Sequence, residues 1–377
     1  MILDSQRHKF ALPRELCYLN AAYMGPQPLA ALAVTEAQAQ LRARPWQVSE
    51  RDFFTEIERA RGLFARIIGA ETDDIAIVPS VSYGLAVAAR NITLEAGQRI
   101  VALEGQFPSN AYPWLNLPRD CGATVDFIAR PEGDTWTDAL LTHIAAHEAS
   151  IAIVALPNHH WANGAAIDLV AVGEAVRKIG ARLVLDTTQS LGAAPFDLAA
   201  IDPDFVASAG YKWLFCPYGI SFLYVAKRNQ DGVPLEENWI NRLGSEDFSR
   251  LVDYQPAYQP GARRFDAGER PFFAVPAAST SMEMILDWGI DNIAETLASH
   301  NRTISAIFAE AGYRVQDEAA RGPHLMGVVS PEPLDADFSA RLRKAGVSVS
   351  IRGNAIRIAP HVYNDEEDFE RLRNALA

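Results

Sequence analysis

Short apolar runs alternate with longer amphipathic or alanine-rich segments through the first two thirds of this 377-residue chain, and this alternation constrains the fold more than any other feature. The runs are residues 75–78, 100–103, 124–128, 151–156, 182–186, 205–208 and 220–225. Most are too uniformly apolar to have one face in water, and intervening segments such as 53–68 and 169–179 have helical spacing. The pattern predicts an α/β fold with a mostly parallel, seven-stranded sheet.

The end of the sheet and the rest of the chain differ from this pattern. Only residues 209–219 separate the last two runs, too few for a helical crossover, so we expect 220–225 to run antiparallel. Residues 233–270, rich in Pro, Gly, Tyr and Arg, predict an irregular connection near a site or an interface. Beyond them we expect helices at 277–286, 293–311, 335–344 and from Asp365, and strands at 325–329, 347–351 and 355–359. We therefore predict a large domain, residues 19–260, and a small α+β domain formed by 1–18 and 261–377.

Composition excludes several classes of protein. Hydrophobic residues make up 49% of the chain, which is typical of a folded globular protein. The net charge of -13 disfavours nucleic acid and anionic membranes as partners. The three cysteines lack C-x-x-C spacing, and the polar residues 1–10 do not resemble a signal peptide. No stretch has the apolar length of a membrane span, so we expect a soluble, cytoplasmic protein.

Common cofactor and metal motifs are missing. The sequence contains no G-x-G-x-x-G, no P-loop and no G-x-S-x-G. His143 and His147 are four residues apart, but the glutamate of H-E-x-x-H is absent, so we interpret them as solvated helix histidines and expect no metal.

An acid and a lysine follow two of the predicted strands. Asp186 comes directly after the apolar residues 183–185, and Lys212 follows the run 205–208. Open α/β sheets build their ligand sites at such strand ends. Pyridoxal 5′-phosphate (PLP) needs a lysine amine for attachment and an acid to keep its ring nitrogen protonated, so the pair suits this cofactor. A buried ion pair, or a lysine that lies on the surface, is the alternative.

The segments around these residues resemble the class V aminotransferase group of fold-type I PLP enzymes, which includes cysteine desulfurases, kynureninases and isopenicillin N epimerase-like proteins. The resemblance covers about residues 17–376 and implies the PLP-dependent transferase fold type I. It is carried by SAGYKWL at 208–214, PYGISFLYV at 217–225, DTTQ at 186–189 and YLNAAYMG at 18–25.

The resemblance assigns roles to the central residues. It implies that Lys212 forms the Schiff base with PLP and then moves the substrate's α proton, while Asp186 pairs with the pyridine nitrogen. Gln189 and Asn158 match positions close to the phenolic oxygen of the cofactor. Ordinary hydrogen bonding of buried amides is the alternative for these two residues.

Further positions match the family's contacts with the phosphate and the ring. Phosphate requires N–H groups and small hydroxyls at a helix start, and Ser82, with Val81 beside it, is our first candidate. Helix capping requires the same residue types. By resemblance, Tyr211 lies near the phosphate, and Phe107 stacks over the pyridine unless it is a core aromatic. Ala209 stands where the family has a small hydroxyl residue.

The substrate is expected to meet an arginine. A guanidinium can bind an α-carboxylate through two hydrogen bonds, and Arg357 precedes a Tyr-Asn pair by six positions, as the family's carboxylate-binding arginine does. Arg352 is a second candidate. His160, within a His-His-Trp cluster at 159–161, and Asn20, from the amino-terminal segment, complete the expected substrate-binding set.

Two departures from the family pattern limit the activity. The family usually has Thr or Ser at the position of Glu269, where it contacts the phosphate in the partner subunit, so Arg263, Arg264 or Arg270 replaces it or the interface contact differs. No cysteine follows Cys216, which excludes cysteine desulfuration.

The resemblance implies a homodimer with active sites at the subunit interface, acting on a small-molecule amino acid. Transamination is the first expectation. A PLP-dependent lyase of the kynureninase or C-S lyase type is the alternative, favoured by Phe107 and the cluster at 159–161. A protein that binds PLP without turnover is a second alternative. The side chain of the substrate stays open because these reactions share one cofactor adduct and diverge by geometry.

Overall fold

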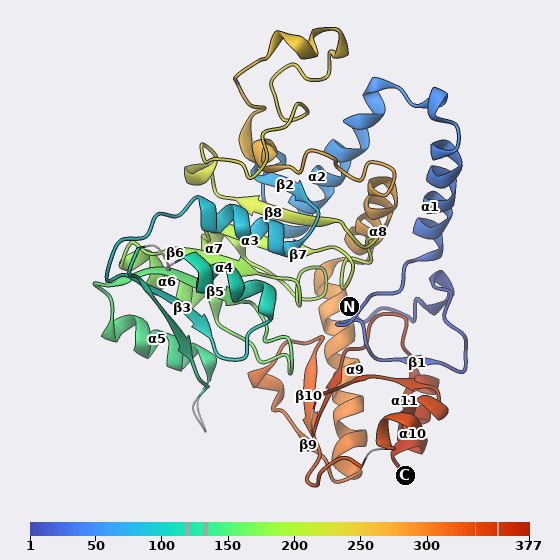
Figure 1. The fold of residues 1–377 in the computed structure, drawn as a ribbon. Helices are drawn as coiled ribbons and strands as arrows, with labels where there is room; N and C mark the ends of the chain where they lie inside the picture. Colours follow the sequence, from blue (N-terminus) through green and yellow to red (C-terminus); the bar gives the residue numbers. More distant parts are fainter. Residues whose placement is uncertain (118–120, 131–134, 336, 353) are drawn as a thin grey trace.

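A computed structural model describes residues 1–117, 121–130, 135–335, 337–352 and 354–377, and Figure 1 shows a large sheet with helices above a smaller sheet-and-helix unit. The large sheet has seven strands in the order β2-β8-β7-β6-β5-β3-β4. They are β2 (Ile75–Val78), β3 (Arg99–Leu103), β4 (Thr124–Ile128), β5 (Ile151–Pro157), β6 (Arg182–Asp186), β7 (Phe205–Ala209) and β8 (Ser221–Val225). Each lies within one residue of its predicted bounds, and the prediction that the last one runs antiparallel to its neighbours is confirmed.

Both faces of this sheet are buried except at its edge strand β4, which explains the uniformly apolar runs. In β5, Val154 and Leu156 contribute to one hydrophobic core, whereas Ile153 and Ala155 contribute to another. Successive side chains of a strand point to opposite faces, so each strand supplies both cores. The first core contains residues of α2 (Thr55–Ile68), α5 (Trp136–Ala146), α6 (Leu169–Lys178), α7 (Leu198–Ile201) and α8 (Val275–Trp288), and the second contains residues of α3 (Val81–Arg90) and α4 (Tyr112–Asn116).

The smaller unit contains a four-stranded antiparallel sheet, in the order β12-β13-β10-β9. Its strands are β9 (Arg314–Val315), β10 (Met326–Val329), β12 (Ser350–Arg352) and β13 (Ala355–Ile358), and its helices are α9 (Ile290–Glu310), α10 (Phe338–Lys344) and α11 (Glu366–Leu376). The boundary at residue 260 stays a prediction. Contacts cross it, because α8 packs against both α2 and α1 (Leu29–Arg42).

The prediction of one continuous strand at 347–351 is wrong. The structure has two strands there, β11 (Val347–Ser348) and β12, which belong to different sheets. The cause is the amino-terminal segment: β1 (Cys17–Tyr18) pairs in parallel with β11, and Leu19 N–H donates to the carbonyl of Ser348. The backbone groups of β11 are therefore occupied by a segment distant in sequence, and only the later residues pair with β13.

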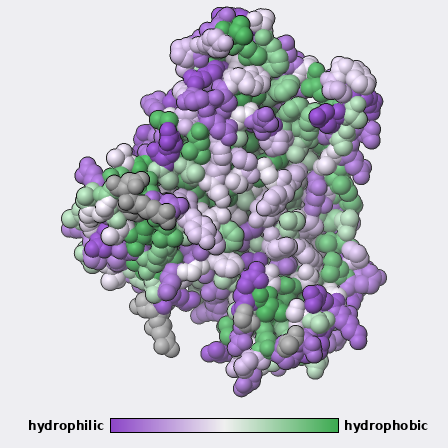
Figure 2. Space-filling view, viewed as in Figure 1, coloured by the Kyte–Doolittle hydropathy of each residue, from purple (hydrophilic) through white to green (hydrophobic). Residues whose placement is uncertain are grey.

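Hydrophilic residues spread over most of the face shown in Figure 2, with apolar side chains gathered in smaller groups. In the described part of the chain, we find no helix with the length and apolarity needed to cross a membrane. The same residues contain no cluster of His, Cys, Asp and Glu suited to a metal. His143 is less solvated than we expected, because its Nε2 lies 3.0 Å from Asp126 Oδ2.

A buried ionic cluster fastens the irregular segment to the large sheet. Asp266 is 1% exposed and accepts hydrogen bonds from Arg61 Nη1 and Nη2 at 3.1 and 2.7 Å. It also accepts from Ile77 N–H at 2.7 Å and from Arg270 Nη1 at 2.9 Å. One carboxylate thus compensates two buried guanidiniums and a strand N–H.

We expect Asp266→Ala to lower the free energy of unfolding by about 3–5 kcal/mol, because it leaves two buried cations without their shared carboxylate. Urea unfolding followed by circular dichroism measures this. Asp253→Ala is the matched control: its exposed pair with Arg250 is expected to contribute below about 1 kcal/mol. Equal losses in the two variants would contradict the assignment of the cluster as a structural centre.

Candidate active site

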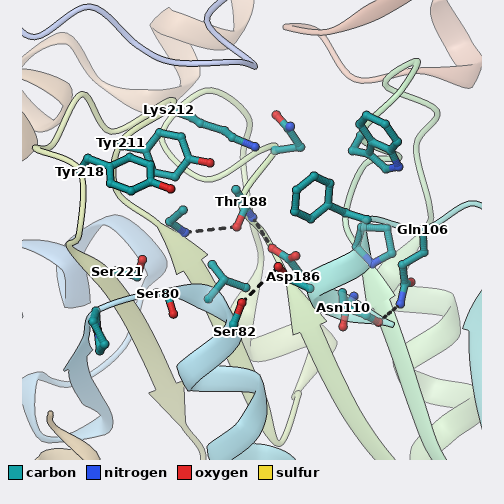
Figure 3. Close-up of a pocket in the computed structure, with 18 of the residues that line it drawn as sticks. Ser80, Ser82, Gln106, Asn110, Asp186, Thr188, Tyr211, Lys212, Tyr218 and Ser221 are labelled. Carbon is teal, nitrogen blue, oxygen red and sulfur yellow. Dashed lines mark hydrogen bonds between the residues drawn. The ribbon is translucent and has the colours of Figure 1, made fainter. Parts of the chain in front are cut away.

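A cavity of about 250 Å³ lies at the carboxyl edge of the large sheet. Its lining includes Pro157 and Asp186 at the ends of β5 and β6, and Ala209 at the end of β7. Figure 3 shows Lys212, Tyr211 and Tyr218 entering it on one side and Ser80 and Ser82, at the start of α3, on the other. The strand-end position is the one at which open α/β sheets bind ligands.

Asp186 and Lys212 extend into this cavity from neighbouring strand ends. Asp186 is buried, and its Oδ1 accepts from Thr188 N–H at 3.0 Å. Burial raises the pKa of Asp186, and the hydrogen bonds from Thr188 oppose the shift. Lys212 is 6% exposed, and burial lowers the pKa of its amine to about 8, with the charge of Asp186 opposing and that of Arg357 adding to the shift.

No salt bridge joins these two residues, both of which the structure describes. They are therefore not the buried ion pair that the sequence left as an alternative, and Lys212 is not a surface residue. A lysine with a pKa of about 8 carries far more neutral amine at neutral pH than an ordinary lysine, and neutral amine is the nucleophilic form.

The amino-terminal segment fits tightly against the lysine loop. Gly25 N–H donates to the carbonyl of Tyr211 at 3.0 Å. A Cβ on Gly25 would lie 2.1 Å from the carbonyl oxygen of Lys212, so any side chain would displace the loop. This close approach accounts for the glycine of the YLNAAYMG segment.

Aromatic rings surround the lysine amine. Lys212 Nζ lies 5.5 Å from the ring centroids of both Phe107 and Tyr211. Phe107 is 40% exposed and lines the cavity, so it is not the core aromatic that the sequence left as an alternative. Its ring packs edge-on against Trp161 at 5.6 Å, while Tyr211 contacts Tyr218 at 4.7 Å.

Two serines at the start of α3, Ser80 and Ser82, have different hydrogen-bond partners. Ser80 is the N-cap: its Oγ accepts from Tyr83 N–H at 3.1 Å. Ser82 is exposed and donates to Ser109 Oγ at 3.1 Å, and both Val81 and Ser82 line the cavity. Ser82 therefore does not serve as the helix cap, which leaves its hydroxyl available at a helix N-terminus.

Both amides predicted near the phenolic oxygen, those of Asn158 and Gln189, are hydrogen-bonded within the protein. Asn158 donates from Nδ2 to Ser190 Oγ at 3.2 Å, and it does not line the cavity. Gln189 lines it, but its amide bonds to the carbonyl of Ala22 at 3.2 Å and to Trp213 Nε1 at 3.1 Å.

The two histidines of the 159–161 cluster point in different directions. His160 stacks on Trp136 with the ring centroids 5.7 Å apart, and it is not part of the lining. His159 and Trp161 line the cavity instead. The cluster flanks the bridge between His159 and Ala166, and consecutive side chains of extended backbone point to opposite sides.

Arg357, on β13, is buried without a carboxylate partner in the described part of the chain. Nη1 donates to the carbonyl of Trp161 at 3.0 Å, and Nη2 donates to Ser350 Oγ at 3.3 Å. Ser350 in turn donates to Asn20 Oδ1 at 2.8 Å, so Asn20 reaches Arg357 through Ser350. Burial lowers the pKa of Arg357 to about 10. A buried cation of this kind fits an anionic ligand that the protein itself does not supply.

Sequence reasoning missed three polar residues of this region. Thr188, within the DTTQ segment, and Ser109, two residues after Phe107, both line the cavity. Ser350 lies opposite Arg357 in the register of β12 and β13, and this pairing was hidden because the boundary of β12 was not foreseen.

The arginines suggested as substitutes at Glu269 have partners in their own chain. Arg263 binds Glu58 and Asp73, and Arg270 binds Asp266. Arg264 donates from Nη1 to the carbonyl of Gly232 at 3.3 Å.

A family model described as aminotransferase class-V matches residues 36–372. The chain belongs to the class-V aminotransferase family. It is 31% identical over 333 residues to an uncharacterized aminotransferase, YcbU, of Bacillus subtilis, and the match covers 87% of this chain and 85% of the relative. Isopenicillin N epimerase of Streptomyces clavuligerus is 24% identical, with 99% of this chain and 97% of the epimerase covered.

Solved structures of the same fold extend the match. A variant of C-DES with glycine covalently linked to its PLP cofactor has a TM-score of 0.88 at 17% identity, with 98% of each chain covered. An apo cysteine desulfurase from Thermococcus onnurineus has a TM-score of 0.84 at 19% identity, covering 99% of this class-V chain and 98% of the desulfurase. The predicted family resemblance and fold type I are thus confirmed, and the predicted cofactor is the one that C-DES carries.

The pKa of Lys212 gives a testable pH dependence. We expect an amine-reactive probe to modify Lys212 of the cofactor-free protein at a rate that rises with pH and is half-maximal near pH 8. Asp186→Asn removes the negative charge that stabilises the ammonium form, so the half-maximal pH is expected to fall. Mass spectrometry of the Lys212 peptide, from about pH 6 to about pH 10, measures the rate.

Asp253→Asn, a change at an exposed and distant carboxylate, serves as the control and is expected to leave the profile unchanged. An unchanged midpoint in Asp186→Asn would contradict the electrostatic coupling.

Proposed function

We propose that this protein is a PLP-dependent enzyme that transaminates an amino acid and holds the cofactor through Lys212. The observation that carries the proposal is the buried Lys212 amine, with a pKa of about 8, in a cavity that also contains Asp186. The donor set fits the cofactor: an amine for attachment, an acid at the end of the neighbouring strand, a hydroxyl at a helix start that does not cap the helix, and aromatic rings beside the amine. Bound PLP supplies an electron sink for the bond that breaks at the substrate's α-carbon.

Each wall of the cavity has a proposed task in holding the cofactor. Asp186, fixed by Thr188 N–H, would bind the ring nitrogen. Ser82, the N–H groups near Val81 and the Tyr211 hydroxyl would bind the phosphate, since a helix N-terminus favours anions. Phe107 would cover one face of the ring.

Gln189 and Asn158 are proposed to lie near the phenolic oxygen of the cofactor and to position the surrounding segments through hydrogen bonds. The amide of Gln189 joins Ala22 to Trp213, the residue directly after Lys212. Asn158 fixes Ser190 on the segment that follows Asp186. These hydrogen bonds would hold the segments that follow β5, β6 and β7 in fixed positions relative to one another.

Lys212 is also the proposed acid and base. Its Nζ can accept a proton from the substrate's α-carbon and would donate it to the C4′ carbon of the cofactor, because a group with a pKa of about 8 exchanges protons readily near neutral pH. Arg357 would bind the α-carboxylate and orient the α-carbon toward this amine. Asn20 and Ser350 would hold the Arg357 guanidinium in position. His160, which stacks on Trp136 outside the cavity, would support the neighbouring residues His159 and Trp161.

Transamination is supported by the named aminotransferase among the relatives. Desulfuration through a cysteine is disfavoured because none of the three cysteines lines the cavity. Cys17 and Cys216 are buried, and burial raises the pKa of both thiols, which suppresses the reactive thiolate. A neighbour in complex with cysteine persulfide is a cystine C-S lyase, so lyase chemistry is the rival to be tested.

We also propose a cytoplasmic homodimer with the sites at the interface. Large apolar side chains are exposed in two segments of the chain, at Trp46 (77%) and at Tyr254 (84%). Burial of such side chains against a partner subunit would remove them from water, which supports the proposed interface. The free thiols of Cys17 and Cys216 fit a reducing compartment.

Lys212→Ala tests the proposed function. Purified protein with added PLP is expected to show a visible absorbance band, and to form keto acid from an amino acid when a keto acid acceptor is present. Lys212→Ala is expected to lose the band and at least about a thousandfold in turnover, within the range for removal of a general acid–base group. Lys227→Ala, an exposed lysine outside the cavity, is the control.

Turnover by Lys212→Ala at the wild-type rate would overturn the proposal. Keto acid that appears with ammonia, and without any acceptor, would assign the lyase reaction instead.

Ser350→Ala tests the support of Arg357. Loss of one hydrogen bond to a buried guanidinium is expected to raise the KM for the amino acid about 3- to 10-fold, with a much smaller change in kcat. Steady-state kinetics measure both constants. Ser339→Ala, at an exposed position on α10, is the control. A fall in kcat alone would contradict a role in binding the carboxylate.

A further inference from the structure

Arg352 lies beside Arg357 on one face of the small sheet. Ser350 is opposite Arg357 in the register of β12 and β13, and Arg352 comes two residues later on β12. Side chains two positions apart on a strand share a face, so Arg352 is the diagonal neighbour of Arg357. Its positive charge contributes to the lowered pKa of Arg357.

Trp161 connects the two arginines with the cavity. Its carbonyl accepts from Arg357 Nη1 at 3.0 Å, and the Arg352 guanidinium lies 5.9 Å from its ring centroid. Its ring packs against Phe107, and Lys212 Nζ lies 5.5 Å from the Phe107 ring centroid. A series of contacts therefore connects the Lys212 amine, through the rings of Phe107 and Trp161, with the guanidinium of Arg352.

Arg352, like Arg357, has no carboxylate partner among the described residues, whereas several other arginines of the small unit do. Arg341, Arg371 and Arg373 pair with Asp335, Glu367 and Glu310. Arg352 instead donates from Nη1 to the carbonyl of Ile351 at 2.9 Å. In a chain with a net charge of -13, two adjacent guanidiniums without an acid form a site for anions that come from outside.

We propose that Arg352 binds an anionic group on the substrate's side chain while Arg357 binds the α-carboxylate. The substrates are then amino acids with an acidic side chain and the corresponding dicarboxylic keto acids. Trp161, between the cations, sets the path of the side chain. This inference rests on the proposed function, because it assumes that the α-carbon faces Lys212.

Substrate preference tests the inference. The ratio of kcat/KM for aspartate over asparagine, and for glutamate over glutamine, compares a carboxylate with an amide of nearly equal size. We expect the larger ratio in the wild type to exceed about tenfold, within the range for loss of a charge-assisted hydrogen bond. Arg352→Gln is expected to bring it close to one, whereas Arg343→Gln, at an exposed position on α10, is expected to leave it unchanged. A wild-type ratio near one, or a ratio that Arg352→Gln does not lower, would overturn the inference.

Binding without turnover separates this inference from the proposed function. Titration calorimetry of the PLP-loaded protein compares succinate with butyrate, and glutarate with valerate, at two ionic strengths. Tighter binding of a dicarboxylate that Arg352→Gln abolishes supports the two-cation site even if no amino acid is turned over, in which case the proposed reaction alone fails. Amino acid turnover with equal binding of the paired acids supports the reaction and overturns the two-cation site.

Discussion

The carboxyl ends of parallel strands meet at one edge of a sheet, and the candidate site depends on this geometric constraint. The side chains of the strands are buried in two hydrophobic cores, and the polar residues at the strand ends are brought together although they are distant in sequence. Asp186 and Lys212 are 26 residues apart in number, yet both follow neighbouring strands, β6 and β7. The sheet topology therefore determines where the candidate site lies, and the side chains at the strand ends determine what it can bind.

Burial also tunes the residues that it assembles. Removal of water lowers the pKa of Lys212 and raises that of Asp186, so desolvation acts against the charged form of both groups. Arg357 lowers the pKa of Lys212 further, which links the group that would bind substrate to the group that would react with it. The charges of Asp186 and Arg357 thus both act on the pKa of Lys212.

Local patterns were sufficient to predict the large sheet, because each strand is an apolar run bounded by polar residues. The residues that follow those strands, Asp186 and Lys212, were accessible for the same reason. Contacts set by distant pairing were not: the division of β11 from β12 requires knowledge of β1, and the role of Ser350 requires the register with β13. The side on which His160 lies depends on a single bridge, which the sequence of the 159–161 cluster does not encode.

The parallel pairing of β1 with β11 also sets the order of assembly. Asn20 and Ser350 are separated by 330 positions, and the segment that holds Gly25 against the lysine loop is itself paired with the small unit at Leu19 and Ser348. During synthesis, the large sheet can be complete while residues 17–25 still await strands that have not left the ribosome. Since such distant contacts form slowly, the lysine loop is expected to be among the last regions to reach its native arrangement, so the buried environment that lowers the pKa of Lys212 would exist only in the completed chain.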